Sequence, residues 1–380
     1  MGRLGELEGA GLLRVPDDGR GRAAAEGQAA ARGLAFVDAS SNDYLGLAAA
    51  DVSRETDVQG STVGAGASRL VHGTRGPHLA LEAAVADWVR LPTALLATSG
   101  YAANVGLLGA LARPGTLVVS DRLNHASIID GCRLGRAEVS VTPHLDLAAV
   151  ESALAAGAAA TARWVVVESC YSMDGDGPDL AALRALCDRY DAALLVDEAH
   201  ALGVFGPEGA GRCAALGVVP DALVGMFGKA VGSQGAFVAG SAALRSLLWN
   251  DARSFVFSTA TSPRLAEATL LHVQRVRSAD ADRATLLDRV RALRAALTAE
   301  RIAVGPGLGG PIVPILVGDN ERAAAVVTEL ERNGVLAQAI RPPTVPAGTA
   351  RIRLTVTARW PADAPLRVAG AVARALQQQA

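Results

Sequence analysis

The chain has 380 residues, half of them hydrophobic and 19% charged, and its formal net charge is −2. This length allows a large core and two domains, and the near-neutral charge excludes the basic surface that nucleic-acid binding requires. Aromatic residues contribute only 4%, so the core must consist of aliphatic side chains and alanine. The composition therefore predicts a globular protein without a nucleic-acid partner.

Neither a membrane span nor a metal site is expected. The uncharged run Leu91–Ala112 contains a proline, three glycines and several polar residues, which favours a buried strand, loop and helix over a span. The N-terminus has no apolar signal region, which predicts a cytoplasmic protein. The cysteines form no CxxC pair and have no metal-ligand spacing with histidine, so we expect reduced thiols. They are Cys132, Cys170, Cys187 and Cys213.

Short apolar runs alternate with helical segments through the middle of the chain. Residues 1–38 precede this region and predict one helix near Leu4–Leu13, and a glycine-rich loop at residues 59–79 leads into a helix at Leu79–Arg90. Such alternation indicates a mostly parallel sheet covered by helices on both faces. The predicted strands are Ala94–Ala97, Thr116–Ser120, Trp164–Glu168, Ala193–Asp197, Ala222–Met226 and Ala236–Ala239. The predicted helices between them are Tyr101–Ala112, Asp146–Ala155, Asp179–Tyr190 and Ala242–Asn250.

The pattern changes after Pro263, where an arginine-rich helical region extends to about Arg301. Strands and helices then follow in an α+β order, which indicates a second, smaller domain. We therefore divide the chain into an N-terminal segment (1–38), a large domain (39–270) and a small C-terminal domain (271–380). The elements predicted for the small domain are strands at Ile312–Val317, Val335–Ile340 and Arg351–Thr357, and helices at Glu321–Asn333 and from Ala364.

Lys229 is the only lysine among the 36 lysine and arginine residues of the chain. Arginine keeps its charge and is a poor nucleophile, whereas a buried lysine can lose its proton and form a Schiff base with a carbonyl. Chance survival of one lysine in an arginine-rich sequence is the alternative. The glycine and apolar neighbours of Lys229 make a solvated surface charge a poor explanation, so we predict a Schiff-base lysine.

Asp197 and His200 follow an apolar strand, at the sheet edge where parallel α/β folds bind ligands. The sequence Asp-Glu-Ala-His also occurs as a nucleotide-binding motif in helicases, but the chain has no G-x4-G-K-[ST] loop to bind phosphate. Pyridoxal phosphate (PLP) needs a lysine and an acid that keeps its ring nitrogen protonated. Asp197 lies 32 residues before Lys229 and could be that acid, although a purely structural aspartate is the alternative.

Two further segments follow predicted strands and are candidates for cofactor contacts. Thr98–Asn104 opens a helix, so its backbone N–H groups and the helix dipole would face an anion such as a phosphate. Many strand-to-helix turns carry Ser-Gly, and this signal alone is weak. His125 is either a structural histidine, the commoner case, or an imidazole stacked on a cofactor ring.

The chain resembles the α-oxoamine synthases, a PLP-dependent family that condenses an amino acid with an acyl thioester and releases carbon dioxide. The resemblance implies an α/β fold of the type I PLP-dependent transferases, which is aspartate aminotransferase-like. That fold has a mostly parallel large-domain sheet and a smaller α+β C-terminal domain. It also implies a homodimer with its active site at the subunit interface. The motifs are SNDYLGL (41–47), GAGASRLVHGT (64–74), TSGYAAN (98–104), DRLNHAS (121–127), YSMDGD (171–176), VDEAHALGVFGPEGAG (196–211), FGK (227–229) and IRPPTVPAGTARIRLT (340–355).

The resemblance also implies roles for single residues. Lys229 would carry the Schiff base and act as a base, while Asp197 would pair with the pyridine nitrogen. His125 would stack on the ring, and His200 and Ser172 would contact its hydroxyl side; either histidine could stabilise an oxyanion. The other implied contacts are Gly100 and Tyr101 to the phosphate, Arg353 and Asn42 to the amino-acid carboxylate, and Thr344 and Arg14 to the acyl substrate.

Within the family, the run Ile340–Arg353 is similar to that of the biotin-pathway member, which joins L-alanine to a pimeloyl thioester of CoA or acyl carrier protein. Members that use glycine with acetyl- or succinyl-CoA, or serine with a long-chain acyl-CoA, share the same site residues and remain alternatives. A non-catalytic subunit that serves as a dimer partner is a further alternative, but such chains typically lose the lysine.

The chain departs from the family pattern in two places. The residue three before the lysine is often Thr or Ser, whose hydroxyl binds phosphate; here it is Met226, and a thioether cannot donate that bond. Ser233 or the partner chain could replace it. The segment Ala48–Gln59 is also shorter than the family pattern, and the implied contact of Arg14 with the acyl substrate is the role that this difference affects most.

Overall fold

The computed structural model describes residues 2–9, 19–50, 62–305 and 307–379. The chain forms two compact units. The large unit comprises residues 45–171 and 177–283, and the small unit comprises residues 1–44, 172–176 and 284–380. This division differs from the sequence-based one, because the N-terminal residues belong with the C-terminal part and the later boundary lies after Arg283. The pairing of β1 (Val37–Asp38) with β10 (Val335–Leu336) explains the first difference.

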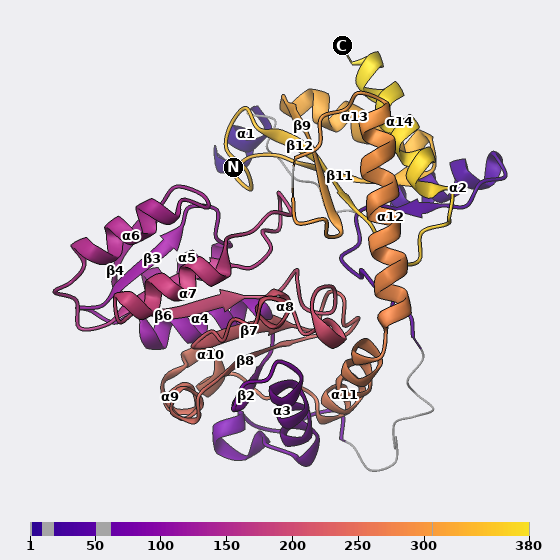
Figure 1. Cartoon of the computed structure of the whole chain (residues 1–380). Coiled ribbons are helices and arrows are strands. Elements are labelled where there is room, and N and C mark those ends of the chain that lie inside the picture. The colour runs from indigo at the N-terminus through magenta and orange to yellow at the C-terminus, as the bar shows by residue number, and fades with distance from the viewer. Residues whose placement is uncertain (1, 10–18, 51–61, 306, 380) are drawn as a thin grey trace. The chain divides into compact units, whose positions relative to one another are not determined.

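A seven-stranded sheet of order β2-β8-β7-β6-β5-β3-β4 forms the centre of the large unit (Figure 1). The strands from β7 to β4 in this order run parallel, and β8 is antiparallel to both of its neighbours. The expected α/β fold with a mostly parallel sheet is confirmed. The strands are β2 (Thr93–Ala97), β3 (Leu117–Asp121), β4 (Glu138–Thr142), β5 (Arg163–Glu168), β6 (Ala193–Asp197), β7 (Ala222–Met226) and β8 (Ala236–Gly240).

Both faces of this sheet are buried, because successive side chains of a strand point to opposite faces. Val118 and Val166 belong to a core formed with α4, α5 and α9, whereas Val119 and Val165 belong to a second core formed with α6 and α7. This explains why the central strands are continuously apolar. The helices are α3 (Gly76–Trp88), α4 (Gly100–Leu111), α5 (Ala126–Gly135), α6 (Leu147–Ala156), α7 (Leu180–Arg189), α8 (Arg212–Leu216), α9 (Ala242–Asp251), α10 (Arg253–Val256) and α11 (Pro263–Arg277), with short turns η1 (Arg69–Gly73) and η2 (Pro207–Gly209).

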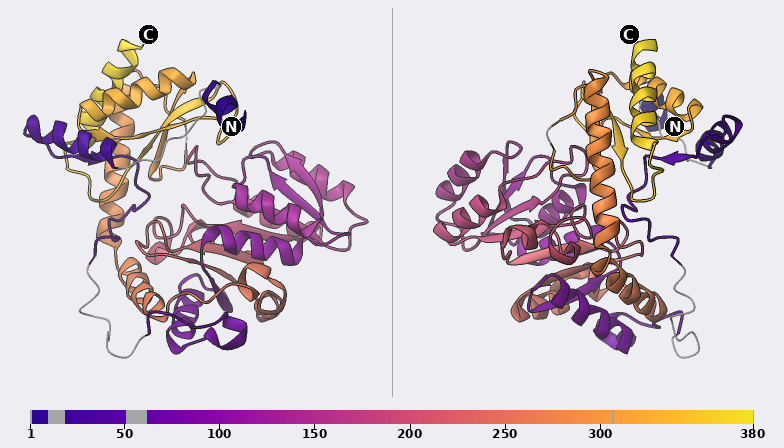
Figure 2. Two further views of the ribbon diagram at one scale, coloured as in Figure 1. Left: turned by 180° about the vertical axis from the view of Figure 1, so that it is seen from behind. Right: turned by 45° about the vertical axis from the view of Figure 1, so that its right-hand side comes forward.

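The small unit contains an antiparallel sheet of order β11-β12-β9. Helix α13 packs on this sheet and on α14, and the two helices are orange and yellow in Figure 2. The strongly one-sided distribution of apolar residues on these helices explains the packing. The elements are α1 (Gly2–Gly9), α2 (Arg20–Ala31), β9 (Ile312–Gly318), α13 (Asn320–Arg332), β11 (Gln338–Ile340), β12 (Ala350–Thr355) and α14 (Ala364–Gln378), together with β1, β10 and most of α12 (Asp280–Ala299).

The sequence analysis missed several elements and merged others. The short helices α8 and α10 were not predicted, nor was α2, since only one helix was expected in residues 1–38, and the single strand expected at Val335–Ile340 forms β10 and β11. Strand β4 lies at an edge of the sheet and is largely exposed, so its sequence lacks the continuous apolar run of the central strands. Helix α5 was not predicted at all. The arginine-rich region after Pro263 forms two helices, because α11 ends at Arg277 and α12 begins at Asp280.

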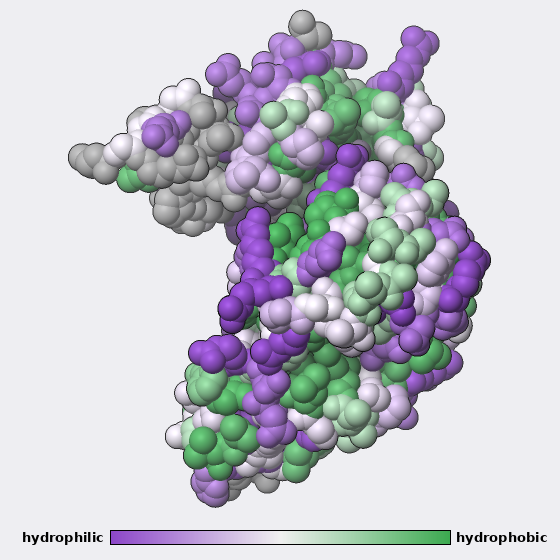
Figure 3. Space-filling model, turned by 90° about the vertical axis from the view of Figure 1, so that its left-hand side faces the viewer, coloured by the Kyte–Doolittle hydropathy of each residue, from purple (hydrophilic) through white to green (hydrophobic). Residues whose placement is uncertain are grey.

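Neither the helices nor the thiols of the described residues suit a membrane span or redox chemistry. No helix in the described ranges is long and apolar enough to cross a membrane. Hydrophobic and hydrophilic residues lie side by side on the face seen in Figure 3. All four cysteines are buried, and none of them forms a disulfide. Burial raises the pKa of Cys132 to about 11 and that of Cys187 to about 12.

A buried histidine joins the start of α3 to a distant loop. His78 Nδ1 accepts a hydrogen bond from the backbone N–H of Arg75 at 3.0 Å, so Nε2 carries the proton and donates to the Thr261 carbonyl at 2.8 Å. The side chain is fully buried. Burial is the main reason why the pKa of His78 lies below its ordinary value.

This histidine should make stability depend on pH. The unfolded chain binds a proton at His78 more readily than the folded protein, so its contribution is lost as the pH falls below about 6.5. We expect the difference in free energy of unfolding between wild type and His78→Gln to shrink from pH 8 to pH 5 in urea titrations. The same substitution at the exposed His72 serves as the control. A constant difference for His78→Gln would contradict the assignment.

Candidate active site

Two neighbouring parallel strands of the large unit end at the predicted cofactor residues. Strand β6 ends at Asp197, its partner β7 ends at Met226, and Lys229 follows in the next turn. Gly232 closes this turn with φ +69°, and any side chain there would collide with the backbone at Ala48, so glycine is required. The sheet therefore brings the acid and the amine to the same edge.

The amine of Lys229 contacts a buried imidazole. Its Nζ lies 2.9 Å from Nε2 of His200, which follows β6 in the turn after Asp197. His200 is buried, whereas Lys229 is half-buried. An ammonium can only donate, so Nε2 of His200 is the acceptor when the lysine is charged. The contact holds the reactive amine at the end of the sheet.

The carboxylate of Asp197 is buried and held by two donors. Oδ1 accepts from the backbone N–H of Ala199 and Oδ2 accepts from Nδ2 of Asn104 on α4, both at 2.8 Å. A carboxylate has about four lone-pair positions. Asp197 therefore retains the capacity to accept a further hydrogen bond from the N–H of a heteroaromatic ring.

His125 precedes α5 and caps its N-terminus. Its Nδ1 lies 3.2 Å from the backbone nitrogen and 2.8 Å from the hydroxyl of Ser127. The pKa of His125 is lowered, chiefly because the surrounding protein desolvates the ring and also because of Lys229; Asp197 and Asp130 oppose the shift. The imidazole is consequently neutral near pH 7.

Helix α4 begins at the buried Gly100 with Ser99 as its N-cap. A side chain at Gly100 would collide with the thioether of Met226, which lies directly against this glycine. The departure predicted at Met226 therefore has a structural counterpart: an apolar group packs beside the helix N-terminus. The hydroxyl of Ser233, considered as a replacement phosphate donor, lies 2.7 Å from that of Thr269.

Tyr101 follows Gly100, and its side chain is about half exposed. The phenol donates a hydrogen bond to Asp130 Oδ2 at 2.7 Å, and this bond is the main cause of the raised pKa of Tyr101. The bond ties the first turn of α4 to α5. A backbone contact of Tyr101 with phosphate remains a prediction.

The small unit carries the predicted carboxylate-binding residues. Arg353 on β12 is buried, and its Nε donates to the Ser172 carbonyl at 2.6 Å. Nη1 donates to Thr355 at 3.2 Å and Nη2 to Asn42 Oδ1 at 3.0 Å. Within the described residues, no carboxylate forms an ion pair with Arg353. A buried guanidinium with only neutral acceptors is suited to an anionic ligand.

The other three residues predicted to bind cofactor or substrate are Ser172, Thr344 and Arg14. Ser172 lies in the small unit, and its contact with the cofactor ring remains a prediction. Thr344 is exposed in the loop between β11 and β12, where its N–H donates to the Arg341 carbonyl at 3.1 Å. Arg14 lies outside the described residues.

The sequence analysis gave no role to two buried polar residues, Asn104 and Ser127. They lie in the TSGYAAN and DRLNHAS motifs, yet nothing in the sequence indicates that they touch each other. Asn104 Nδ2 donates to Ser127 Oγ at 3.0 Å. The packing of α4 against α5 creates this contact, and only the tertiary structure reveals it.

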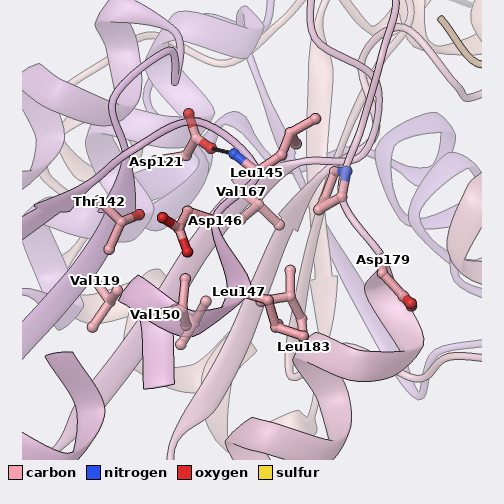
Figure 4. A pocket seen from close by; sticks show the side chains of 12 residues that line it. Val119, Asp121, Thr142, Leu145, Asp146, Leu147, Val150, Val167, Asp179 and Leu183 are labelled. Atoms are coloured by element: carbon pink, nitrogen blue, oxygen red, sulfur yellow. Dashed lines mark hydrogen bonds between the residues drawn. The ribbon is translucent and has the colours of Figure 1, made fainter. Parts of the chain in front are cut away.

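The large unit contains a cavity on the sheet face that α6 and α7 cover, and this cavity is not the active site. It lies between the sheet and helices α6 and α7 and has a volume of about 50 Å³. Figure 4 shows mainly aliphatic side chains around it, with Asp121 accepting a bond from the N–H of Leu145. Known ligand pockets measure about 300–1,000 Å³. The cavity is a packing gap, and Lys229 is not among the residues that line it.

The residues at the sheet edge fit PLP. A buried carboxylate with spare acceptor capacity would serve the ring nitrogen, and the lysine in the turn after the adjacent strand would serve the aldehyde. The N-terminus of α4, where Gly100 carries no side chain, could offer backbone N–H groups to the phosphate. The donor set thus matches the group that the sequence predicted.

Comparisons with known proteins bear on the same assignment. The family model "Aminotransferase class I and II" matches residues 36–370. The 8-amino-7-oxononanoate synthase of Aromatoleum aromaticum is 44% identical over 346 residues, which are 90% of this chain and 88% of that protein. The chain belongs to the α-oxoamine synthases. The enzyme of the same name from Anaeromyxobacter dehalogenans is also 44% identical, over 86% of this chain and 83% of that protein.

Solved structures agree with the α-oxoamine synthase fold. Serine palmitoyltransferase of Sphingomonas wittichii superposes with a TM-score of 0.84 at 29% identity, covering 90% of this chain and 88% of that chain. The 8-amino-7-oxononanoate synthase of Francisella tularensis, at 22% identity, has a TM-score of 0.78 over 90% of this chain and 98% of that chain. The protein is therefore a PLP-dependent acyltransferase with the type I fold.

Proposed function

We propose that this α-oxoamine synthase is an 8-amino-7-oxononanoate synthase of biotin biosynthesis. It would convert L-alanine and a pimeloyl thioester into 8-amino-7-oxononanoate, carbon dioxide and the free thiol. A carbon–carbon bond forms between the alanine Cα and the acyl carbon, while the C–S bond and the bond to the alanine carboxylate break. A cytoplasmic location is part of the proposal, and cell fractionation would test it.

The choice within the family rests on one observation. Relatives that are 41–44% identical over most of the chain are named 8-amino-7-oxononanoate synthase, whereas the serine palmitoyltransferase neighbours are about 30% identical. The run Ile340–Arg353 supports the same choice. Serine palmitoyltransferase remains the second candidate because of its structural similarity.

The large unit supplies groups for proton transfer and charge stabilisation. When bound, PLP supplies an electron sink for negative charge on the substrate α-carbon. Asp197 would keep the ring nitrogen protonated by accepting its N–H. Lys229 Nζ would take the α-proton of alanine and later return a proton, with His200 holding the amine at 2.9 Å. His125 would stack on the ring.

The small unit supplies the recognition of alanine. Arg353 is held by Ser172, Thr355 and Asn42, and its orientation would therefore be set before the substrate arrives. Its planar guanidinium can bind a carboxylate with two parallel hydrogen bonds, which gives both affinity and orientation. Thr344 and Arg14 would contact the acyl substrate.

We also propose that the protein is a homodimer. Exposed apolar side chains on the large unit support this: Leu70, Val71 and Phe257 are 40%, 76% and 72% exposed. The bridge between Ser68 and Thr259 brings their two segments together. An exposed group of this kind is typical of an interaction surface. Sedimentation at the mass of a single 38.7 kDa chain would contradict the proposal.

The proposed reaction is tested by a substrate panel. Alanine, serine and glycine would each be offered with pimeloyl-, acetyl- and palmitoyl-CoA, and thiol release would be measured. Alanine with pimeloyl-CoA should be preferred by roughly tenfold or more, since binding-site differences of a methylene or hydroxyl have effects of this size. Lys229→Ala is the inactive control. A faster rate with serine and palmitoyl-CoA would favour the second candidate instead.

Arg353 is tested by substitution. Arg353→Lys keeps the charge but removes the two-pronged carboxylate contact, so kcat/KM for alanine should fall roughly 30-fold, corresponding to about 2 kcal/mol. The loss should appear mainly in KM for alanine, with KM for the thioester little changed. Arg332→Lys, an exposed arginine on α13, is the control. A folded Arg353→Lys variant with wild-type KM for alanine would refute the role.

A further inference from the structure

A chain of hydrogen bonds joins Asp197 to His125 inside the large unit. Asn104 Nδ2 donates to Asp197 Oδ2 at 2.8 Å and to Ser127 Oγ at 3.0 Å. Ser127 Oγ in turn lies 2.8 Å from His125 Nδ1. The chain connects β6, α4 and α5, and its two central residues had no predicted role.

The direction of each hydrogen bond follows from the chemistry of its ends. The backbone N–H of Ser127 also points to His125 Nδ1, and a backbone N–H can only donate. Nδ1 is therefore an acceptor and carries no proton in this arrangement. Asp197 is an acceptor when ionised, which fixes Asn104 with its NH2 group toward the carboxylate. Ser127 Oγ then accepts from Asn104 and donates to Nδ1.

Burial of Asn104 and Ser127 favours one orientation of these hydrogen bonds over the reverse. Asn104 is 2% exposed and Ser127 is fully buried, so water cannot readily replace a lost partner. An unsatisfied buried polar group costs roughly 1–3 kcal/mol. Reversing the Ser127 hydroxyl would direct its proton toward the NH2 group of Asn104, which cannot accept it. The alternative orientation is therefore disfavoured along the whole chain.

We propose that Asn104 and Ser127 are positioning residues that hold His125 in the tautomer with its proton on Nε2. The ring then presents Nε2–H as a hydrogen-bond donor. It cannot act as a base through Nδ1 while both Ser127 donors are in place. One part of this proposal rests on the proposed function: that Nε2–H of His125 faces the bound cofactor or substrate. The tautomer itself depends on the protein alone.

The charged groups that act on His125 come from three elements. Asp197 at the end of β6 and Asp130 on α5 favour its protonation, whereas Lys229 after β7 opposes it. The two Ser127 donors also oppose it, because they hydrogen-bond the lone pair that a second proton would occupy. Removing the hydroxyl donor should therefore make proton binding stronger, while the backbone donor of residue 127 stays in place.

The test uses nitrogen-15 labelling of the six histidines and NMR of the full-length protein without cofactor. His125→Gln identifies the His125 signals. In the wild type we expect one tautomer, with Nε2 protonated and Nδ1 unprotonated. A wild-type spectrum with Nδ1 protonated would overturn the proposal, and this measurement needs no variant to fold.

Two variants then test the roles of the chain. Ser127→Ala and Asn104→Ala should each raise the proton affinity of His125 roughly tenfold, as expected for the loss of about one net hydrogen bond, because only the backbone N–H of residue 127 then holds Nδ1 as before. Ser152→Ala and Asn250→Ala, both at exposed sites, are matched controls without effect. A purely structural role would lower thermal stability but leave the His125 titration unchanged, and that result would refute the proposal. Failure of the substrate panel would not affect this measurement.

Discussion

The candidate site depends on the direct parallel pairing of β6 and β7. Parallel neighbours place their carboxyl ends at the same edge, so residues 32 positions apart in the chain are brought together there. One strand ends in the acid and the next leads into the lysine. The burial of both sheet faces makes this arrangement rigid, because the central strands contribute side chains to two separate cores.

The sequence was sufficient to predict strands that show a continuous apolar run, and to single out a residue type that occurs only once. Strands β6 and β7 were predicted with their observed bounds, since fully buried parallel strands appear as continuous apolar runs. Lys229 was found because no other lysine competes with it. Strand β4 was missed because an exposed edge strand lacks that pattern, and the N-terminal residues were not paired with β10 because pairing over such a distance leaves no local signal.

The polar network was beyond sequence analysis for a different reason. Asn104 and Ser127 were both inside quoted motifs, but an asparagine in a helix and a serine after a histidine have many ordinary explanations. Their significance comes from the contact of α4 with α5, which sets two side chains 23 residues apart at 3.0 Å. In the same way, the reason for glycine at position 100 is not evident until Met226 is seen against it.

The burial of the cysteine thiols affects how they would react with a thioester substrate. A thiolate exchanges acyl groups with thioesters, and its abundance falls as the thiol pKa rises. With Cys132 at about 11 and Cys187 at about 12, very little thiolate exists at neutral pH, and burial keeps the acyl donor away. With the proposed thioester as substrate, this burial would keep the protein from being acylated, and the free thiol released in each turnover would meet no accessible cysteine for disulfide formation.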